Sequence, residues 1–306
     1  MIRKQDRLVR LLLALAVLAL WVMNASRPGA AVEGCLTGCA RATRPDDGTV
    51  RIVSLNVLHD FPHFAYLPQR LALVATEVRR LDADIVLLQE VPWTWRLGSA
   101  AAYLGRATGL NYAYLRANGN RWTILFEEGE AILSRFPLRE VRFTELQPAE
   151  GPFRHRVAVS ALVDTTLGPL RVVSTHLANQ NPAANQGQAA SLMQFVAAQP
   201  GPTIIGGDFN ATPDSVTIRN LQPAWVDSFT ALAPADAGLT CCVDDLTAPP
   251  GEPLEKRIDY LFLAPGPANA WRVRSSDRLF TAPQLTPVGR IWASDHVGLW
   301  VVLEGK

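Results

Sequence analysis

The stretch Thr203–Pro213, TIIGGDFNATP, joins a short apolar run to a cluster of polar residues. Its Thr-Ile-Ile run predicts a buried strand, because β-branched side chains suit a pleated, packed surface, and the two glycines are expected to end that strand. Asp208 and Asn210 follow, with Phe209 between them. Side chains two positions apart on an extended chain point the same way, so a carboxylate and an amide are expected side by side. Taken alone, the motif is more typical of a strand followed by an Asx turn.

The N-terminal segment, residues 1–31, begins with basic residues and continues with the thirteen-residue apolar run Leu11–Met23. Because a membrane-spanning helix needs about 20 apolar residues, this run favours a secretory signal peptide over a permanent span. Gly29 and Ala31 suit the −3 and −1 positions of a cleavage site. An uncleaved membrane anchor is the alternative, with a lipid on Cys35 ranked below it. The protein is therefore expected outside the cytoplasm, secreted or anchored to the membrane.

The four cysteines are Cys35, Cys39, Cys241 and Cys242. In an exported protein they favour one or two disulfides. Adjacent cysteines are poor partners on geometric grounds, so a bridge from the N-terminal pair to the later pair is expected. The competing arrangement is a Cys35–Cys39 bridge with the other two as free thiols. A zinc site ranks low, because the pairs lack CxxC spacing and have no neighbouring histidine.

The remaining chain is long enough for one large domain. Residues 32–48 are rich in polar residues and predict a linker, and residues 49–304 are expected to form a single catalytic domain. The formal net charge is +1, and the N-terminal segment contributes most of the excess positive charge. The rest is mildly acidic, so affinity for a phosphate must come from a local site. No obligate protein partner is evident, and a monomer is expected.

Polar residues recur at the ends of predicted strands. Val50–Leu58 predicts a strand with Asn56 near its end, and Leu71, Val74, Val78 and Leu81 then recur at helical spacing. The strand Ile85–Leu88 follows and leads to Glu90. A strand, a helix and a strand in this order form a βαβ-like unit, whose functional groups collect where strands end.

The later segments follow the same pattern. Strands are predicted at 130–134, at 157–163 and 170–174 as a hairpin, at 256–262 and at 297–303, with a helix at about 188–198. They bring in further polar residues at strand ends: His176, Asp259, Asp295 and His296.

Together the segments SLNV, LQEV, EGEAILSRFP, STHL, GGDFNATP, RIDYLF and ASDH span residues 54 to 296. Their order and spacing resemble the endonuclease/exonuclease/phosphatase family of DNase I-like, metal-dependent phosphoesterases. The resemblance implies an α/β fold, a four-layer α/β/β/α sandwich of two mixed β-sheets flanked by helices. The strand and helix pattern is compatible with that fold without selecting it.

The resemblance also implies a metal site. Glu90 is the implied principal ligand, with Asp295 and Asn56 beside it. Hydrolysis of a phosphoester needs a hard cation against the phosphate charge, and Mg²⁺, or Mn²⁺ in its place, suits carboxylate and amide oxygens.

The implied catalytic residues surround this metal site. Asp208 and Asn210 are expected to align or activate water, while His296, oriented by Asp259, acts on the phosphate or as the base. Asp208 and His296 both remain candidates for the base. His176 is implied as a second active-site histidine, supported by Glu128. Arg156 matches a position that is often basic in the family, where a phosphate contact and a structural ion pair are equal alternatives.

Several other residues have an ordinary structural interpretation. His59 and His63 lie in a loop with aromatic residues, where a substrate rim and a plain exposed loop are equally expected; His155 lies between two arginines. The tryptophans Trp93, Trp95 and Trp122 form a stacking surface or fill the core.

The substrate class is left open by the sequence. An exported nuclease is slightly favoured, because the family is broad, and a secreted lipid or small-molecule phosphodiesterase or phosphatase, similar to a sphingomyelinase, is the alternative. A non-catalytic phosphate-binding module ranks lower, because none of the eight polar positions named for the family is missing.

Overall fold

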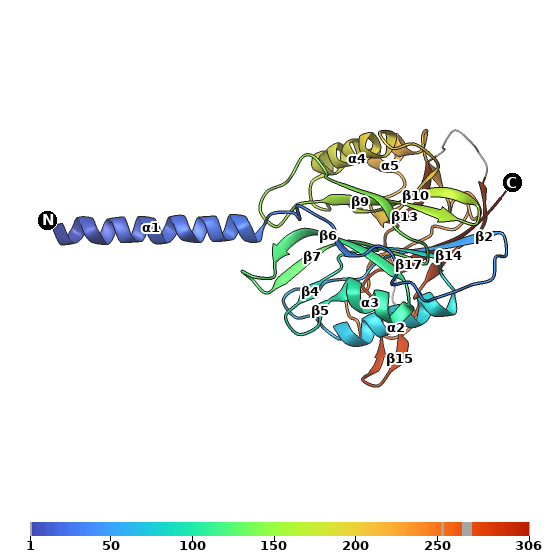
Figure 1. Cartoon of the computed structure of the whole chain (residues 1–306), viewed down its shortest axis with the longest axis horizontal. Helices are drawn as coiled ribbons and strands as arrows, with labels where there is room; N and C mark the ends of the chain where they lie inside the picture. Colours follow the sequence, from blue (N-terminus) through green and yellow to red (C-terminus); the bar gives the residue numbers. More distant parts are fainter. Residues whose placement is uncertain (1, 252–253, 265–270, 306) are drawn as a thin grey trace.

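The computed structural model describes residues 2–251, 254–264 and 271–305, so Met1 of the N-terminal segment lies outside the described residues. Two large β-sheets lie face to face, and helices cover the outer face of each (Figure 1). The predicted α/β/β/α sandwich of two mixed sheets is therefore confirmed.

The first sheet contains the N-terminal half of the domain and the two last long strands. Its order is β1 (Glu33–Cys35), β6 (Asn111–Asn120), β7 (Phe126–Ser134), β3 (Ile85–Gln89), β2 (Thr49–Asn56), β17 (Gly298–Gly305) and β14 (Trp271–Leu279). Two short strands, β4 (Trp93–Thr94) and β5 (Gly98–Ser99), extend it at the start of β7. Only β2 and β3 run parallel among the paired strands described in this sheet.

The second sheet is built from the middle of the chain. Its order is β12 (Val226–Asp227), β13 (Asp259–Ala264), β11 (Thr203–Asp208), β10 (Gly168–His176), β9 (Val157–Thr165) and β8 (Arg139–Glu145). β9 and β10 form the predicted hairpin, and β10 pairs in parallel with β11. A separate small ribbon consists of β15 (Gln284–Thr286) and β16 (Gly289–Ile291).

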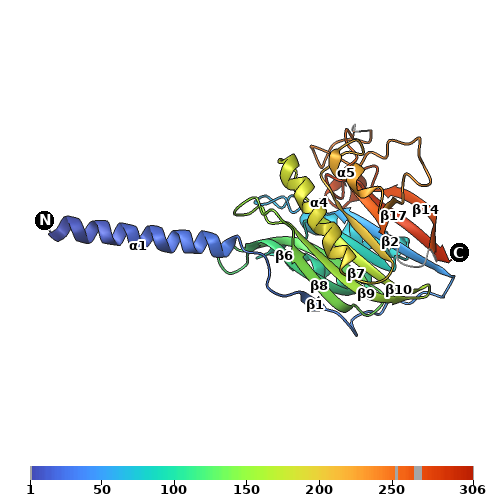
Figure 2. The same cartoon turned by 90° about the horizontal axis from the view of Figure 1, so that it is seen from above.

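The helices of the domain lie outside the sheets. α2 (Leu67–Arg80) and α3 (Ala100–Thr108) cover the first sheet, and α4 (Pro182–Ala197) and α5 (Val216–Leu221) cover the second (Figures 1 and 2). Helix α4 begins earlier than expected because Asn181 caps it, accepting a hydrogen bond from the backbone of Ala184, and Pro182 suits the first helical position.

Three apolar layers hold the sandwich together. One lies between the two sheets and includes Ile52, Leu87, Val172 and Ile204. The others lie between each sheet and its helices. Because a sheet buried on both faces needs apolar residues on both, strands β2, β3 and β11 are buried along nearly their whole length.

The expectation that Gly206 and Gly207 end a strand is wrong, because β11 continues through both to Asp208. A Cβ atom on Gly206 would lie 2.7 Å from Cδ1 of Leu87 in the facing sheet, and one on Gly207 would lie 2.4 Å from the carbonyl oxygen of Thr175. The glycines therefore allow close approach of neighbouring backbone and of the facing sheet.

Strand register brings the ends of four strands together. Asn56 lies opposite Gln89 in the parallel pair β2–β3, and His176 lies opposite Asp208 in the parallel pair β10–β11. Asp259, the first residue of β13, also lies opposite Asp208. The polar residues that follow these strands consequently share one end of the sandwich.

The N-terminal segment forms helix α1 (Ile2–Ala25), which projects away from the domain (Figure 1). Its section Gln5–Ala25, 21 residues with a mean hydropathy of 2.2, is long and apolar enough to cross a membrane. The helix therefore extends beyond the apolar run Leu11–Met23 at both ends. Within residues 32–48, strand β1 pairs with β6 and adds an edge to the first sheet.

The disulfides connect near neighbours. Cys35 pairs with Cys39, and Cys241 pairs with Cys242. The expected bridge between the two pairs is wrong, since β1 holds Cys35 beside Tyr112 on the edge strand β6, whereas Cys241 lies beside Lys256 and His296. The competing arrangement is right about Cys35–Cys39 and wrong about free thiols at the second pair.

Candidate active site

An open pocket of about 640 Å³ lies at the end of the sandwich where these strands finish. Eight of the residues singled out in the sequence line it: Glu90, His176, Asp208, Asn210, Cys241, Cys242, Asp295 and His296. Asn56 lies beneath it, 1% exposed, and Asp259 is 3% exposed behind His296. The structure thus brings all eight predicted catalytic and metal-binding residues to one place.

Glu90 follows β3 with a positive backbone φ of 54°. Its Oε1 accepts a hydrogen bond from Nδ2 of Asn56 at 3.2 Å, and its Oε2 accepts one from the backbone of His59 at 3.1 Å. Burial alone raises the pKa of Glu90, but the imidazoles of His59 and His176 and these hydrogen bonds lower it to about 2. Glu90 is therefore an ionised carboxylate at neutral pH.

Asn56 links the two halves of the site. Its Nδ2 donates to Glu90 and also to Oδ2 of Asp208 at 3.2 Å, across 152 residues of sequence. Its Oδ1 accepts from the backbone of Leu58, so its amide nitrogen faces the carboxylates. A role for Asn56 as a metal ligand through its oxygen stays a prediction.

Asp208 and Asn210 leave β11 as expected, while Phe209 between them is fully buried. Asn210 has a positive φ of 49°, and its backbone N–H donates to Oδ1 of Asp208 at 2.8 Å. Burial and, next, the nearby charge of Asp259 raise the pKa of Asp208 to about 7. Asp208 thus holds a proton more readily than an ordinary aspartate.

His296 and Asp259 form the expected pair. Nδ1 of His296 lies 2.9 Å from Oδ2 of Asp259, and its Nε2 lies 3.7 Å from Oδ2 of Asp208. Burial lowers the pKa of His296, but the two carboxylates outweigh burial and raise it well above its ordinary value. The ring is therefore fixed in place, with Nε2 directed toward Asp208.

His176 contacts Arg156 rather than Glu128. Nη1 of Arg156 donates to Nδ1 of His176 at 2.9 Å. Its Nε2 lies 2.9 Å from Nδ2 of Asn210 and 3.3 Å from Oδ2 of Asp208, so each ring nitrogen faces a donor group and Nε2 also faces a carboxylate. Burial and then Arg156 lower the pKa of His176 well below its ordinary value.

The expectation that Glu128 supports His176 is wrong. Glu128 lies opposite Asn118 in the β6–β7 pair and accepts a hydrogen bond from that amide. The register of the β6–β7 pair therefore places Glu128 against Asn118.

Sequence reasoning missed a second buried carboxylate on β7. Glu130 is 1% exposed and accepts a hydrogen bond from Ser174 at 3.3 Å. Burial, and next the charge of Glu128, raise the pKa of Glu130 well above its ordinary value. The EGE spacing places both acids on one face of the strand, and that spacing is the signal that sequence analysis passed over.

Two more residues near Glu90 are not among the predicted site residues. The sequence predicts His59 equally in a substrate rim or in a plain exposed loop, and in the structure its Nε2 lies 3.7 Å from Oε2 of Glu90. Arg70, from α2, is fully buried and donates to the carbonyl oxygens of Val57 and Leu58. Arg70 thereby holds the loop after β2 against the site.

The other histidines have structural surroundings. His155 pairs with Glu145 at 2.6 Å, and the side chain of His63 is 79% exposed. Neither lines the pocket described above.

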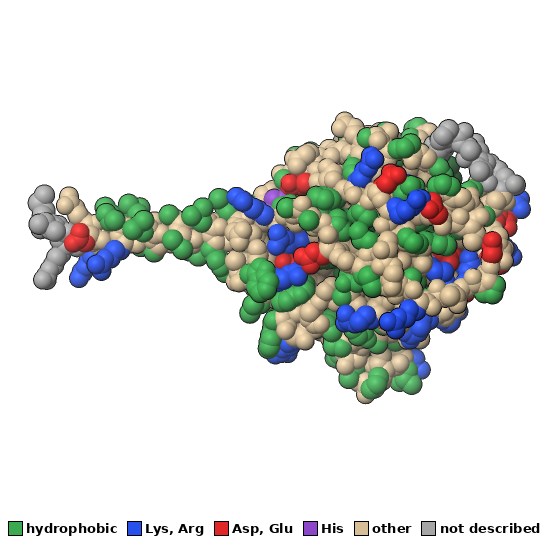
Figure 3. Space-filling view, viewed as in Figure 1, with side chains coloured by type: hydrophobic (Ala, Val, Ile, Leu, Met, Phe, Trp, Pro, Cys, Tyr) green, Lys and Arg blue, Asp and Glu red, His purple; other side chains and the backbone are tan. Residues whose placement is uncertain are grey.

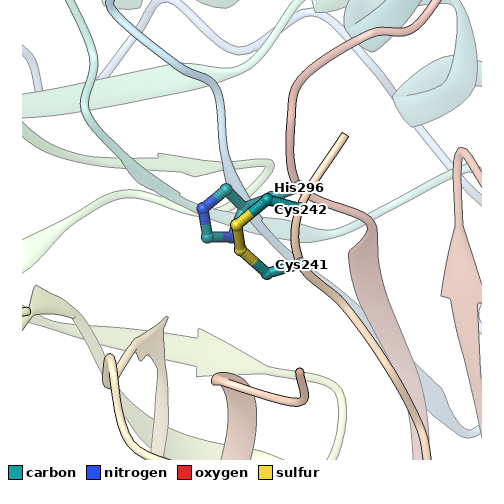
Figure 4. A group of neighbouring side chains, drawn as sticks. All are labelled: Cys241, Cys242 and His296. Carbon is teal, nitrogen blue, oxygen red and sulfur yellow. A yellow bond between two sulfur atoms is a disulfide. The ribbon is translucent and has the colours of Figure 1, made fainter. Parts of the chain in front are cut away.

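The second cysteine pair lies at the wall of the pocket. Figure 4 shows Cys241 and Cys242 beside the ring of His296, and potential ligand atoms of these three residues all lie within 4.8 Å of one another. Asp208, Asp259 and His296 form another such group. In the structure the two sulfur atoms are bonded to each other, so the sulfurs form part of the wall next to the imidazole.

The carboxylates of the site fit a divalent cation. Burial and the charge of Glu90, partly offset by His296, raise the pKa of Asp295, which indicates electrostatic repulsion between these acids. The guanidinium of the buried Arg70 donates its hydrogen bonds to backbone carbonyl groups and not to these carboxylates. Oxygen ligands with an excess of negative charge are what Mg²⁺ and Mn²⁺ prefer.

Comparison with known proteins now adds the family. The model of the Endonuclease/Exonuclease/phosphatase family matches residues 53–296. The chain belongs to this family. Its members are phosphoester hydrolases that typically use a divalent metal, which supports the view that this chain is an enzyme.

Solved structures agree on the fold. A family protein from Leptotrichia buccalis is 17% identical, with a TM-score of 0.65, covering 84% of this chain and 99% of that one. TDP2 from D. rerio, complexed with a single-strand DNA product, is 18% identical with a TM-score of 0.66, covering 84% of this chain and 100% of that one.

A mannosyl-6-phosphatase from Bacteroides thetaiotaomicron is 18% identical with a TM-score of 0.61, covering 83% of this chain and 99% of that one. The comparison with curated proteins gave no match. At these identities the likeness extends to the fold alone, and the family itself rests on the match of the family model.

Proposed function

We propose that this chain is an exported, Mg²⁺- or Mn²⁺-dependent phosphodiesterase. The observation that carries this proposal is the convergence of Glu90, Asp295 and Asn56 on one side of the pocket with Asp208, Asp259 and His296 on the other. An oxygen-rich cation site next to a proton-exchanging pair is what hydrolysis of a phosphoester requires.

The roles of the residues follow from their positions. Glu90 and Asp295 would hold a divalent cation, with Asn56 beside them. Such a cation, when bound, would supply positive charge next to the phosphate and the leaving oxygen. Asp208 and His296, 3.7 Å apart, orient the attacking water and between them accept its proton. Asp259 keeps the imidazole of His296 in its orientation.

His176 and Asn210 form another part of the pocket wall. Nε2 of His176 lies 2.9 Å from Nδ2 of Asn210 and 3.3 Å from Oδ2 of Asp208, so the imidazole and the amide together would position a phosphate oxygen. Arg156 adds positive charge behind the ring.

The proposal is tested with the purified chain and a set of phosphoesters: bis-p-nitrophenyl phosphate, p-nitrophenyl phosphate, plasmid DNA, RNA and sphingomyelin, each with Mg²⁺ or Mn²⁺. We expect a diester to be hydrolysed, EDTA to abolish the rate, and either cation to restore it. Full turnover in excess EDTA contradicts the metal-dependent mechanism.

The His296→Ala variant tests the proton-exchanging pair. Turnover should fall by roughly 10² to 10⁴, the usual range for loss of an acid-base group, with an unchanged fold by circular dichroism. His155→Ala is the matched control, because that histidine pairs with Glu145 outside the pocket, and its rate should stay near that of the parent. A near-normal rate for His296→Ala shows that this histidine is structural.

A further inference from the structure

Large apolar side chains are exposed at one end of the domain. We define the aromatic rim as five such residues, with their exposed fractions: Phe61 (46%), Trp95 (61%), Trp122 (86%), Leu125 (53%) and Phe153 (43%). Exposed tryptophan is costly in water, and a group of such residues marks an interaction surface.

The members of the aromatic rim lie on adjoining segments. Trp122 and Leu125 are in the hairpin between β6 and β7, and β4 pairs with the first residues of β7, which places Trp95 beside that hairpin. The ring of Phe61 stacks on Phe126 at the start of β7, with centroids 4.4 Å apart. Four of the five residues, Phe61, Trp95, Trp122 and Leu125, therefore lie around the start of β7.

The aromatic rim borders the active site. Phe153 lines a cavity of about 220 Å³ together with Glu90, His59 and Glu128. Backbone pairing also brings the hairpin close to the site: the N–H of Val91, the residue after Glu90, donates to the carbonyl oxygen of Gly129 on β7. Whatever the rim binds is held at the mouth of the site.

Helix α1 leaves the domain at the same end. β1 runs antiparallel to β6, and upstream of it the backbone of Gly29 donates to Arg116 at 2.8 Å. The preceding residues therefore lie toward the hairpin end of β6, and Ala25 is fully buried at the base of the helix. Figure 1 shows α1 projecting from the side that the hairpin of β6 and β7 reaches.

Basic side chains accompany the aromatic rim. Arg27, Arg96 and Arg154 are exposed, and none of them has an ion-pair partner among the residues that the structure describes. The guanidinium of Arg96 lies 4.9 Å from the ring centroid of Trp95. Figure 3 shows hydrophobic and basic side chains together where α1 leaves the domain.

We propose that the aromatic rim docks on a lipid bilayer and holds the mouth of the active site against the headgroup layer. Tryptophan is enriched at the interface between membrane and water, and arginine is attracted to an anionic lipid surface. The bilayer is the occupant that the position of α1 favours, since a helix able to cross a membrane emerges beside the rim. Resting on the proposed function, this assigns the substrate as a phosphoester presented at a membrane surface.

The test uses the full chain in vesicles of phosphatidylcholine and phosphatidylglycerol. Trp122→Cys is labelled with a polarity-sensitive fluorophore, the four native cysteines being paired. The matched control is Leu285→Cys, which is 73% exposed on the ribbon β15–β16. We expect a blue shift and loss of quenching by aqueous iodide for the label at position 122, and neither for the label at position 285.

Equal iodide quenching at the two positions overturns the proposal. So does a blue shift at position 122 that appears with a single-stranded oligonucleotide and not with vesicles, because the rim is then a stacking surface for nucleic acid. Hydrolysis of soluble bis-p-nitrophenyl phosphate by the same samples separates the two proposals. If soluble phosphodiester is hydrolysed but the label at position 122 shows no blue shift, the docking proposal is wrong and the proposed function stands. If the blue shift occurs but no phosphoester is hydrolysed with either Mg²⁺ or Mn²⁺, the proposed function is wrong.

Discussion

Burial and Arg156 together keep His176 neutral. Nη1 of Arg156 donates to Nδ1 of the imidazole at 2.9 Å, and Nδ2 of Asn210 lies 2.9 Å from its Nε2. Burial lowers the pKa of His176 most, and Arg156 lowers it further because a second positive charge would lie next to the guanidinium. His176 is thus a neutral side chain at neutral pH, held between Arg156 and Asn210.

This contact predicts how His176 titrates. In the metal-free protein, His176 should stay neutral well below pH 6.5, its ordinary pKa, and Arg156→Gln should raise its pKa. Because the folded-state pKa is lowered, the contribution to stability is complete above pH 6.5 and is lost as the pH falls from 6.5 toward the folded pKa. NMR titration of the imidazole C–H signals, assigned with His176→Gln, measures both values. An ordinary pKa in the parent protein contradicts the contact.

At the scale of one element, β11 shows why two glycines precede Asp208. The strand is paired on both sides, with β10 and β13, and it also faces the first sheet. Gly206 faces Leu87 and Ser54, and Gly207 meets the backbone of Thr175. Without side chains at these positions, the strand lies close enough for Asp208 to reach Asn56 from the opposite sheet.

Gly207→Ala should therefore destabilise the protein. The added Cβ would lie 2.4 Å from the carbonyl oxygen of Thr175, which is backbone of a paired strand and cannot rotate away. Overpacking of this kind costs about 1–3 kcal/mol, which thermal or urea unfolding measures. Gly305→Ala is the control, since its Cβ would lie 3.8 Å from the nearest atom, on Leu167. Equal stability of the two variants would show that β11 shifts freely.

At the scale of the whole molecule, the two sheets each bring half of the site. Asn56, Glu90, Asp295 and His296 come from the first sheet and the segments that join it, whereas His176, Asp208 and Asp259 come from the second. Packing of the sheets therefore buries several carboxylates close together, and burial and then repulsion between the acids raise the pKa values of Asp208 and Asp295. A divalent cation would relieve this repulsion and couple metal binding to folding.

Mg²⁺ should accordingly raise the melting temperature at constant ionic strength. A ligand that binds only the folded state stabilises it by about 2.7 kcal/mol at one hundred times its Kd. Differential scanning calorimetry with Mg²⁺ and with NaCl of matched ionic strength measures the shift, and Glu90→Gln should lose most of it. The same Mg²⁺-induced shift in Glu90→Gln as in the parent rules out Glu90 as a principal ligand.

The sequence by itself determined the sandwich fold through its family resemblance and placed the polar residues at strand ends. These features are local: periodicity reports which residues are buried, and short motifs keep their residue types and spacing along the chain. The positions of Asn56, Glu90, Asp208 and Asp259 at the ends of their strands were predictable for this reason, and so was the pairing of Asp259 with His296 within the family pattern.

Only the tertiary structure decided the partners. Arg156 contacts His176 in place of Glu128, His59 joins Glu90, and each cysteine pairs with its near neighbour. It also decided that α1 emerges on the side that the hairpin of β6 and β7 reaches. Such neighbours depend on strand register and on how two sheets pack, and a shift of one residue in register would exchange every partner. No local pattern carries that information, because the residues that meet in space are far apart in the chain.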